Sequence, residues 1–280
     1  MTNQPMTNFM LTVGDNLYWT RRLLGEHLRR LGLRAGDAVM VHAGLRAVGP
    51  MLNGPDTLID AIRDVIGNQG TLLCYVNWEQ QYEDALNELG QIPAVLKPDI
   101  APFNTFSSRA SRDHGVFAEF VRTTPGALRS QNPGASVAAI GRLAKWFTTD
   151  HPFDYGYGPG SPFEKLVLTD GKILMIGAPL DTMSILHHAE HLAQIPGKRI
   201  RHMEVPLQLD GEVCWRMIEE FDTADPVVDG LDADYFKTIV EDFLNTESGL
   251  IGRVGGASAV IVSAKAIVQF AVRWLEQRFG

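Results

Sequence analysis

Residues 172–193 read KILMIGAPLDTMSILHHAEHLA, and this stretch decides the fold class. Ile173 to Ile176 is an apolar run of strand length that ends at Gly177-Ala178-Pro179. Asp181 or Thr182 can then cap a helix that carries several histidines. In an open α/β sheet, ligands bind just outside the carboxyl ends of the strands. We therefore expect the histidine cluster to lie close to a ligand site.

Three side chains of the predicted helix share one face. At about 100° per residue, Glu190 lies about 60° and His191 about 40° from His187, whereas His188 points elsewhere. A histidine beside a carboxylate is suited to act as a general base near neutral pH, because the carboxylate orients the ring and stabilises the imidazolium. The spacing is equally compatible with a polar helix face that contains one hydrogen-bonded buried histidine.

The composition is that of an ordinary folded protein. Of the 280 residues, 45% are hydrophobic, so we expect residues 16–280 to form one domain after a loose N-terminal arm at 1–15. The net charge of −8 argues against nucleic acid as a partner and is compatible with a cationic one. No signal-peptide pattern and no apolar run of roughly 18 residues is found, so we expect a cytoplasmic protein without a membrane partner. The oligomeric state is not determined, and a homodimer is among the assemblies that the sequence allows.

A second apolar strand, at 38–42, ends in His42 and continues into a loop of small residues. Backbone N–H groups in such a loop can face a phosphate or another anion. The loop has neither a GxGxxG pattern nor a Walker lysine, so it signals no dinucleotide or nucleoside triphosphate site. The candidate ligand contacts of this segment are His42, Gly44, Leu45, Arg46, Ala47 and Val48.

Residues 125–141, PGALRSQNPGASVAAIG, contain three further polar candidates. Arg129, Ser130 and Ser136 could bind a phosphate or a pantetheine amide, although a plain turn uses the same residue types.

Two acidic loops, near 79–104 and 219–234, suit a polycationic substrate. The first follows a strand at 71–76 and has no basic residue from 79 to 88. The second follows a hairpin with an Asp210-Gly211 turn. Aromatic rings stack on flat ligand faces and carboxylates pair with ammonium groups, but a solvated acidic loop has the same composition. The candidate substrate contacts are Tyr75, Trp78, Glu79, Asp181, Glu219 and Asp222.

Several of these stretches, in this order, resemble the aminoglycoside 3-N-acetyltransferase family. The matching segments are VHAGLRAVGP (41–50), GPDTLIDAIRDVIGNQGTLL (54–73), PGALRSQNPGASVAAIG (125–141), YGPGSPFEKL (157–166), GKILMIGAPLDTMSILHHAEHLA (171–193) and EEFD (219–222). One departure is Gly44, where the family commonly has serine.

The resemblance implies a three-layer αβα sandwich around a mixed, largely parallel sheet, unlike the histone-acetyltransferase-like fold. It implies acetyl-CoA as co-substrate and acetylation of the 3-amine of 2-deoxystreptamine aminoglycosides, which gives antibiotic resistance. The first histidine of the LHxAE-type motif is catalytic in the family, and this role falls on His187. The acidic segment after the hairpin supplies its carboxylate partner, which we place on Glu220.

We therefore expect direct acetyl transfer in which His187 takes a proton from the amine and is oriented by Glu220 or Glu190. Two alternatives belong to other classes. His187 to His191 spells H-x-x-E-H, which would make the protein a zinc hydrolase with Glu190 as base. A non-catalytic binder of cationic sugars would keep the acidic loops and would not need His187. We expect no metal.

Overall fold

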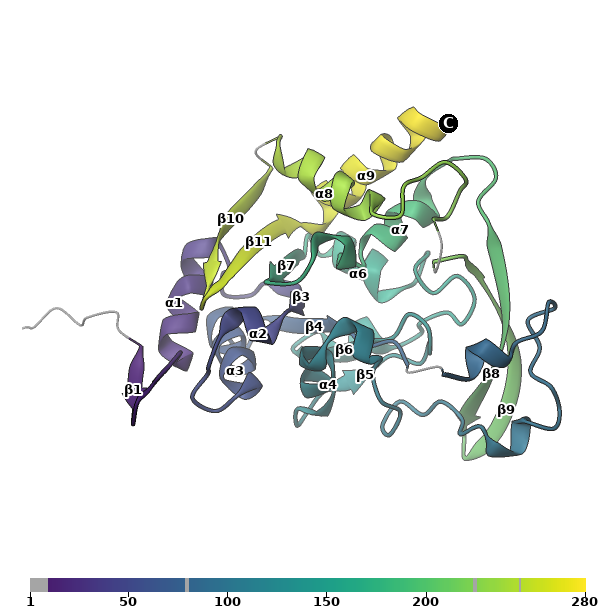
Figure 1. Cartoon of the computed structure of the whole chain (residues 1–280), viewed down its shortest axis with the longest axis horizontal. Coiled ribbons are helices and arrows are strands. Elements are labelled where there is room, and N and C mark those ends of the chain that lie inside the picture. Colours follow the sequence, from purple (N-terminus) through teal and green to yellow (C-terminus); the bar gives the residue numbers. More distant parts are fainter. Residues whose placement is uncertain (1–9, 79–80, 224–225, 247) are drawn as a thin grey trace, which may run out of the picture.

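A seven-stranded sheet forms the centre of the computed structural model, which describes residues 10–78, 81–223, 226–246 and 248–280 (Figure 1). The strand order is β10-β11-β7-β3-β4-β6-β5. The strands are β3 (Ala38–Ala43), β4 (Thr71–Tyr75), β5 (Leu128–Arg129), β6 (Val137–Gly141), β7 (Lys172–Ile176), β10 (Gly249–Val254) and β11 (Ala257–Ser263).

The sheet is mixed, as the family resemblance implies. Parallel pairing is confined to the three central strands, because only β3–β4 and β3–β7 are parallel pairs. The other four pairings are antiparallel, so the parallel share is smaller than expected. One reason is connection length: β10 and β11 are joined by Gly255-Gly256 alone, and a connection this short can only join antiparallel strands.

Helices cover both faces of the sheet, which confirms the three-layer sandwich. Alternate residues of β3 point to opposite sides, so that Met40 packs in one core and Val39 and Val41 in the other. The core around Val39 includes residues of α1 (Arg21–Leu31), α3 (Pro55–Ile66) and α4 (Val116–Thr123). The core around Met40 includes residues of α5 (Ala144–Thr148), α6 (Pro162–Leu168), α7 (Leu186–Leu192), α8 (Tyr235–Leu244) and α9 (Ala264–Phe279).

Several element boundaries differ from the sequence pattern. Thr20 caps α1 by accepting a hydrogen bond from the Leu23 N–H. The residues before it form a small hairpin of β1 (Leu11–Val13) and β2 (Asn16–Tyr18), so 10–15 are not the loose arm we expected; residues 1–9 lie outside the described part. Neither Asp181 nor Thr182 caps α7; both lie in the preceding turn η4 (Leu180–Thr182).

A long hairpin projects from the sandwich (Figure 1). It consists of β8 (Ile200–Leu209) and β9 (Glu212–Phe221), joined at the predicted Asp210-Gly211 turn, where both residues have positive φ. Its inner face packs against the segment after β4 in a small apolar cluster of Trp78, Phe103, Val205, Leu207 and Ile218. The remaining elements are α2 (Leu45–Val48), η1 (Gln81–Ala85), η2 (Lys97–Asp99) and η3 (Arg112–His114). Among the described residues, no helix is long and apolar enough to cross a membrane.

Candidate active site

His187 is the second residue of α7 and is held by a carboxylate one turn further along the helix. Its Nδ1 lies 2.6 Å from Glu190 Oε2, which confirms the shared helix face. The other oxygen of this buried carboxylate accepts a hydrogen bond from the Tyr235 hydroxyl. Because an ionised carboxylate only accepts hydrogen bonds, the proton of the neutral ring resides on Nδ1 and Nε2 is left as an acceptor.

Two aromatic rings fix the orientation of the imidazole. The ring centroid of His187 lies 4.7 Å from that of Tyr157 and 4.8 Å from that of Phe236. The side chain of His187 is 19% exposed, so it is enclosed but still reachable. Within the described part of the chain, no protein group is hydrogen-bonded to Nε2, which leaves this nitrogen free to act on a ligand.

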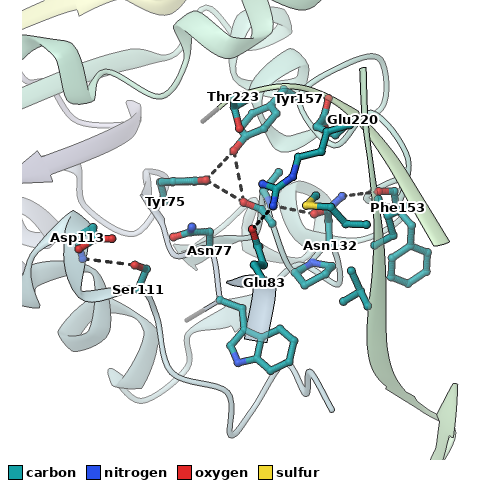
Figure 2. A pocket seen from close by; sticks show the side chains of 18 residues that line it. Tyr75, Asn77, Glu83, Ser111, Asp113, Asn132, Phe153, Tyr157, Glu220 and Thr223 are labelled. Atoms are coloured by element: carbon teal, nitrogen blue, oxygen red, sulfur yellow. Dashed lines mark hydrogen bonds and ion pairs between the residues drawn. The ribbon is translucent and has the colours of Figure 1, made fainter. Parts of the chain in front are cut away.

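His187 lines a cavity of about 370 Å³. A larger cavity of about 490 Å³, whose lining is shown in Figure 2, adjoins it. The residues shared by both linings are Tyr75, Asn77, Asp113, Tyr157 and Thr223. Together the two cavities form one cleft between the carboxyl end of β4, the loop before α6, the start of α7 and the inner face of the β8–β9 hairpin.

Two buried tyrosines join the walls of this cleft. The hydroxyls of Tyr75 and Tyr157 lie 2.6 Å apart, and the Tyr75 hydroxyl also donates to the Gly134 carbonyl at 2.8 Å. Burial raises the pKa of both hydroxyl groups, so both stay neutral. They give the cleft a polar surface without a charge.

Glu220 lies in the larger cavity and accepts backbone hydrogen bonds from Phe221, Gly156 and Tyr157. It is 9% exposed, and burial raises its pKa to about 7 despite these bonds and the nearby His187. Among the described contacts it makes no hydrogen bond to His187. The partner role that we placed on Glu220 is therefore taken by Glu190 in this structure, because a carboxylate three residues away on the same helix is closer than one on a neighbouring hairpin.

Comparison with known proteins agrees with this geometry. The family model described as aminoglycoside 3-N-acetyltransferase matches residues 40–276. Aminoglycoside N(3)-acetyltransferase III of Pseudomonas aeruginosa is 41% identical over 267 residues, which cover 95% of this chain and 96% of that protein. This chain belongs to the aminoglycoside 3-N-acetyltransferase family.

Two solved structures that align with nearly the whole chain support its membership in this acetyltransferase family. The binary complex of AAC-IIIb with CoASH has a TM-score of 0.93 at 56% identity and covers 94% of this chain and 98% of its own. AAC-VIa bound to sisomicin has a TM-score of 0.90 at 36% identity, with 94% and 100% coverage.

The loop after β3, expected to bind the acetyltransferase's coenzyme through free N–H groups, is more closed than predicted. It folds into the short helix α2, in which the N–H groups of Ala47 and Val48 donate to the Gly44 carbonyl. The Gly44 N–H donates to Ile176 at 2.8 Å. These three N–H groups therefore have protein partners in this structure, and contact of residues 44–48 with the coenzyme stays a prediction.

His42 is neutral, because burial lowers its pKa to about 3. Its Nε2 lies 3.4 Å from the hydroxyl oxygen of Ser184, which lines the smaller cavity. Contact of His42 with a ligand stays a prediction.

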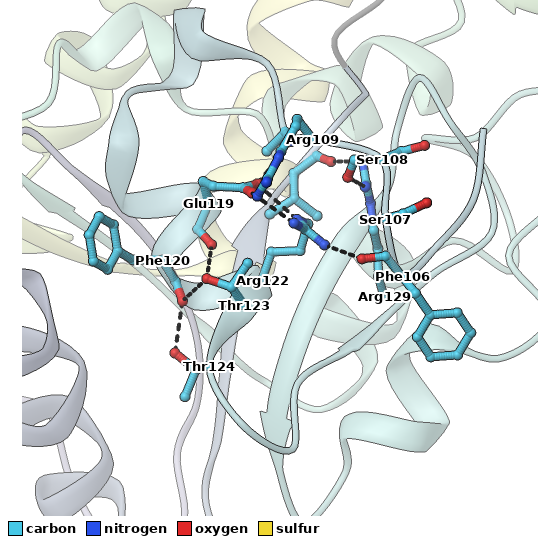
Figure 3. A network of polar contacts seen from close by, with 12 residues as sticks. Phe106, Ser107, Ser108, Arg109, Glu119, Phe120, Arg122, Thr123, Thr124 and Arg129 are labelled. Carbon is cyan, nitrogen blue, oxygen red and sulfur yellow. Dashed lines mark hydrogen bonds and ion pairs between the residues drawn. The ribbon is translucent and has the colours of Figure 1, made fainter. Parts of the chain in front are cut away.

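Arg129, Ser130 and Ser136, the other coenzyme candidates, belong to buried networks instead (Figure 3 shows Arg129). The Arg129 guanidinium donates to Ser136 Oγ at 3.0 Å and to the carbonyls of Ser108 and Val76. Ser130 Oγ bonds to His151 Nδ1 at 2.8 Å and accepts from the Val137 N–H. In this structure these side chains are hydrogen-bonded to protein partners, and their direct contact with the coenzyme stays a prediction.

Three predicted substrate residues lie at the cleft: Tyr75, Trp78 and Asp181. Glu219 does not, because side chains alternate along β9; it points to the opposite face and pairs with His202 Nε2 at 2.9 Å. Asp222 ends the hairpin, donating its N–H to the Arg199 carbonyl, and does not contribute to the described lining. Glu79 lies outside the described residues.

Our residue-by-residue analysis of the sequence missed three components of the site, Asn77, Asp113 and Tyr235, and included Glu83 only as a member of the first acidic loop. Glu83 belongs to the acidic loop that the sequence did indicate, and Asn77 directly follows β4, where a ligand is expected. No local pattern marks Asp113 or Tyr235. They join the site only through packing between elements that are far apart in the chain.

The zinc-hydrolase alternative is not supported by the arrangement of its residues. Glu190 is hydrogen-bonded to His187 and Tyr235, whereas a metalloprotease base would have to reach a metal-bound water. His191 packs against the rings of Tyr155 and Phe221. Among the described residues, no group of three or more His, Cys, Asp or Glu side chains could hold a metal ion.

Proposed function

We propose that this protein transfers the acetyl group of acetyl-CoA to the 3-amine of 2-deoxystreptamine aminoglycosides, with antibiotic resistance as the consequence. Family membership supports the reaction class. The observation that carries the assignment of the base is the position of His187: Nδ1 is hydrogen-bonded to Glu190, no described group is hydrogen-bonded to Nε2, and the residue lines a cleft with carboxylates. A non-catalytic sugar binder would not require this arrangement.

In the proposed reaction, His187 Nε2 takes a proton from the substrate ammonium, which has no lone pair until the proton leaves. The amine nitrogen then attacks the thioester carbonyl, a C–N bond forms, and the C–S bond to coenzyme A breaks. The imidazolium gives this proton to the leaving thiolate, and the nitrogen releases its second proton to solvent as the amide forms. The ammonium and the thioester thus yield the amide, the coenzyme A thiol and one proton. Glu190 keeps the ring in the required tautomer and stabilises its charged form.

We infer that the larger cavity holds the aminoglycoside. Its described lining includes Asp113 and Glu220, whose carboxyl groups suit ammonium groups, and Glu83, which is paired with Arg201. The smaller cavity at His187 would then be the place where amine and thioester meet. We further propose that residues 16–280 act as one acetyltransferase domain that works in the cytoplasm. A homodimer stays one of the assemblies compatible with the sequence.

The direct test compares wild type with His187→Ala in a thiol-release assay with acetyl-CoA and kanamycin. A positioned general base contributes roughly 100- to 10,000-fold, so we expect turnover to fall by about this factor while the circular dichroism spectrum is unchanged. His202→Ala is the matched control, because His202 pairs with Glu219 away from the cleft. Near-normal turnover of folded His187→Ala would show that another group removes the proton.

A further inference from the structure

The acidic cavity contains one basic side chain. Arg201 of β8 is the only lysine or arginine among the described residues that line the larger cavity, where it accompanies Glu83, Asp113 and Glu220. Its backbone pairs directly opposite Glu220 in the hairpin ladder, so both side chains project from the inner face. A positive charge at this place opposes the binding of a polycation, and therefore needs an explanation.

The guanidinium of Arg201 crosses the cavity to the opposite wall. Its Nη2 lies 3.0 Å from Glu83 Oε2, so that β8 and η1 are joined by an ion pair (Figure 2 shows Glu83 in the cavity). The side chain of Arg201 is 35% exposed and that of Glu83 is 27% exposed, so the ion pair is partly desolvated. Burial raises the pKa of Glu83, and Arg201 opposes this rise.

A stabilising role alone accounts poorly for this pair. Partly exposed ion pairs contribute little to folding stability. In contrast, a fixed positive charge in a partly desolvated site repels a ligand ammonium strongly, and such repulsive elements are a common source of specificity. Glu83 would be a good ammonium acceptor if Arg201 did not occupy it.

We propose that Arg201 is a specificity-determining residue of the aminoglycoside site. Its guanidinium takes the position on Glu83 that a substrate ammonium would otherwise occupy. The cavity therefore favours aminoglycosides with a hydroxyl at that position over those with an additional amine. This inference rests on the proposed function, because it assigns the larger cavity to the aminoglycoside.

The test uses two pairs of antibiotics that differ by one amine in place of one hydroxyl: kanamycin B with kanamycin A, and neomycin B with paromomycin. For each pair, the ratio of kcat/KM of the amine to that of the hydroxyl compound is measured. We expect Arg201→Gln to raise this ratio about 5- to 20-fold in at least one pair. Arg201→Lys keeps the charge and should leave the ratio within about twofold of wild type.

Two further variants separate a local from a general charge effect. The double variant Arg201→Gln/Glu83→Gln lacks the carboxylate that would accept the amine, so its ratio should return close to that of wild type. Arg63→Gln makes the same charge change on α3, where Arg63 is 44% exposed, and should not alter the ratio.

The outcomes distinguish the inference from the proposed function. If wild type acetylates the antibiotics and Arg201→Gln leaves both ratios unchanged, Arg201 does not determine specificity and the proposed function stands. If Arg201→Gln does not fold although Arg201→Lys does, the ion pair is structural and the inference is wrong. If no member of either pair is turned over or binds in calorimetric titration, both the inference and the proposed function are wrong.

Discussion

The orientation of His187 depends on a contact within its own helix, and the position of its carboxylate partner depends on a residue far away in the sequence. The Glu190 carboxylate lies on the same helix, three residues away, whereas Tyr235 comes from the first turn of α8. A buried carboxylate is costly unless its oxygens are hydrogen-bonded, and here each oxygen has one partner. The chain Tyr235–Glu190–His187 therefore fixes both the tautomer and the position of the base.

Glu190→Gln tests the role of this carboxylate. The amide can donate to Nδ1, which would place the ring proton on Nε2 and remove the acceptor that the reaction needs. We expect kcat to fall about 10- to 1,000-fold, with the KM for the aminoglycoside changed by less than about threefold, because the loss affects the transition state. Glu241→Gln, at an exposed position of α8, is the control. Steady-state kinetics with half of the wild-type kcat would contradict this role.

At the scale of elements, two loops at the carboxyl ends of β3 and β7 lie in close contact. The Gly44 N–H donates to Ile176, and a Cβ on Gly44 would lie 2.3 Å from the Gly177 carbonyl oxygen. Only glycine fits here without a steric clash, because any other residue has a Cβ. In this chain the glycine therefore coincides with the close contact of the two loops, and its N–H is one of the groups that the contact uses.

Gly44→Ser should destabilise the protein without a change in fold. The two loops would have to separate, and overpacking of this kind costs about 1–3 kcal/mol. For a protein of this size the melting temperature should fall by roughly 2–4 °C per kcal/mol, as measured by calorimetry. The control Ala94→Ser introduces a hydroxyl at an exposed position and should leave the melting temperature unchanged. An unaltered melting temperature in Gly44→Ser would show that the loops can move apart freely.

At the scale of the whole molecule, the cleft lies where the sandwich meets the projecting hairpin. Neither part forms the site alone, because β4 and α7 supply Tyr75 and His187 while the hairpin supplies Arg201 and Glu220. Enclosure by both parts is also the reason why the pKa of Glu220 is raised to about 7. The protonation of Glu220 in the cleft is therefore coupled to the stability of the folded protein.

This coupling predicts a specific pH dependence. The unfolded Glu220 carboxyl releases its proton near pH 4.5, and the folded one near pH 7. Between pH 4.5 and pH 7 the folded state binds more protons than the unfolded state. The contribution of Glu220 to the free energy of unfolding is therefore complete below pH 4.5 and is lost as the pH rises through about 7. The free energy of unfolding of wild type, minus that of Glu220→Gln, should fall by on the order of 2–3 kcal/mol from pH 5 to pH 8 in urea titrations. A flat or rising difference would contradict the raised pKa.

The sequence by itself determined the features that arise within one element or one turn. The apolar runs predicted the central strands, Ser161 caps α6 by accepting the Glu164 N–H, and Asp210-Gly211 forms the hairpin turn. The shared helix face of His187 and Glu190 followed from helical spacing, although the family resemblance had placed the carboxylate partner on Glu220. Such features are predictable because a regular backbone fixes the distance between residues three or four positions apart.

Only the tertiary structure decided which side chains meet across elements. It buried Arg129 and Ser136 against Val76, turned Glu219 away from the cleft, and brought Tyr235 to Glu190 and Arg201 to Glu83. Which side chains are buried and which come into contact depends on how whole helices and sheets pack. The identity of a residue does not reveal this, because an arginine can be buried or exposed. The charge of the cleft and the state of Glu220 are therefore properties of the packed molecule.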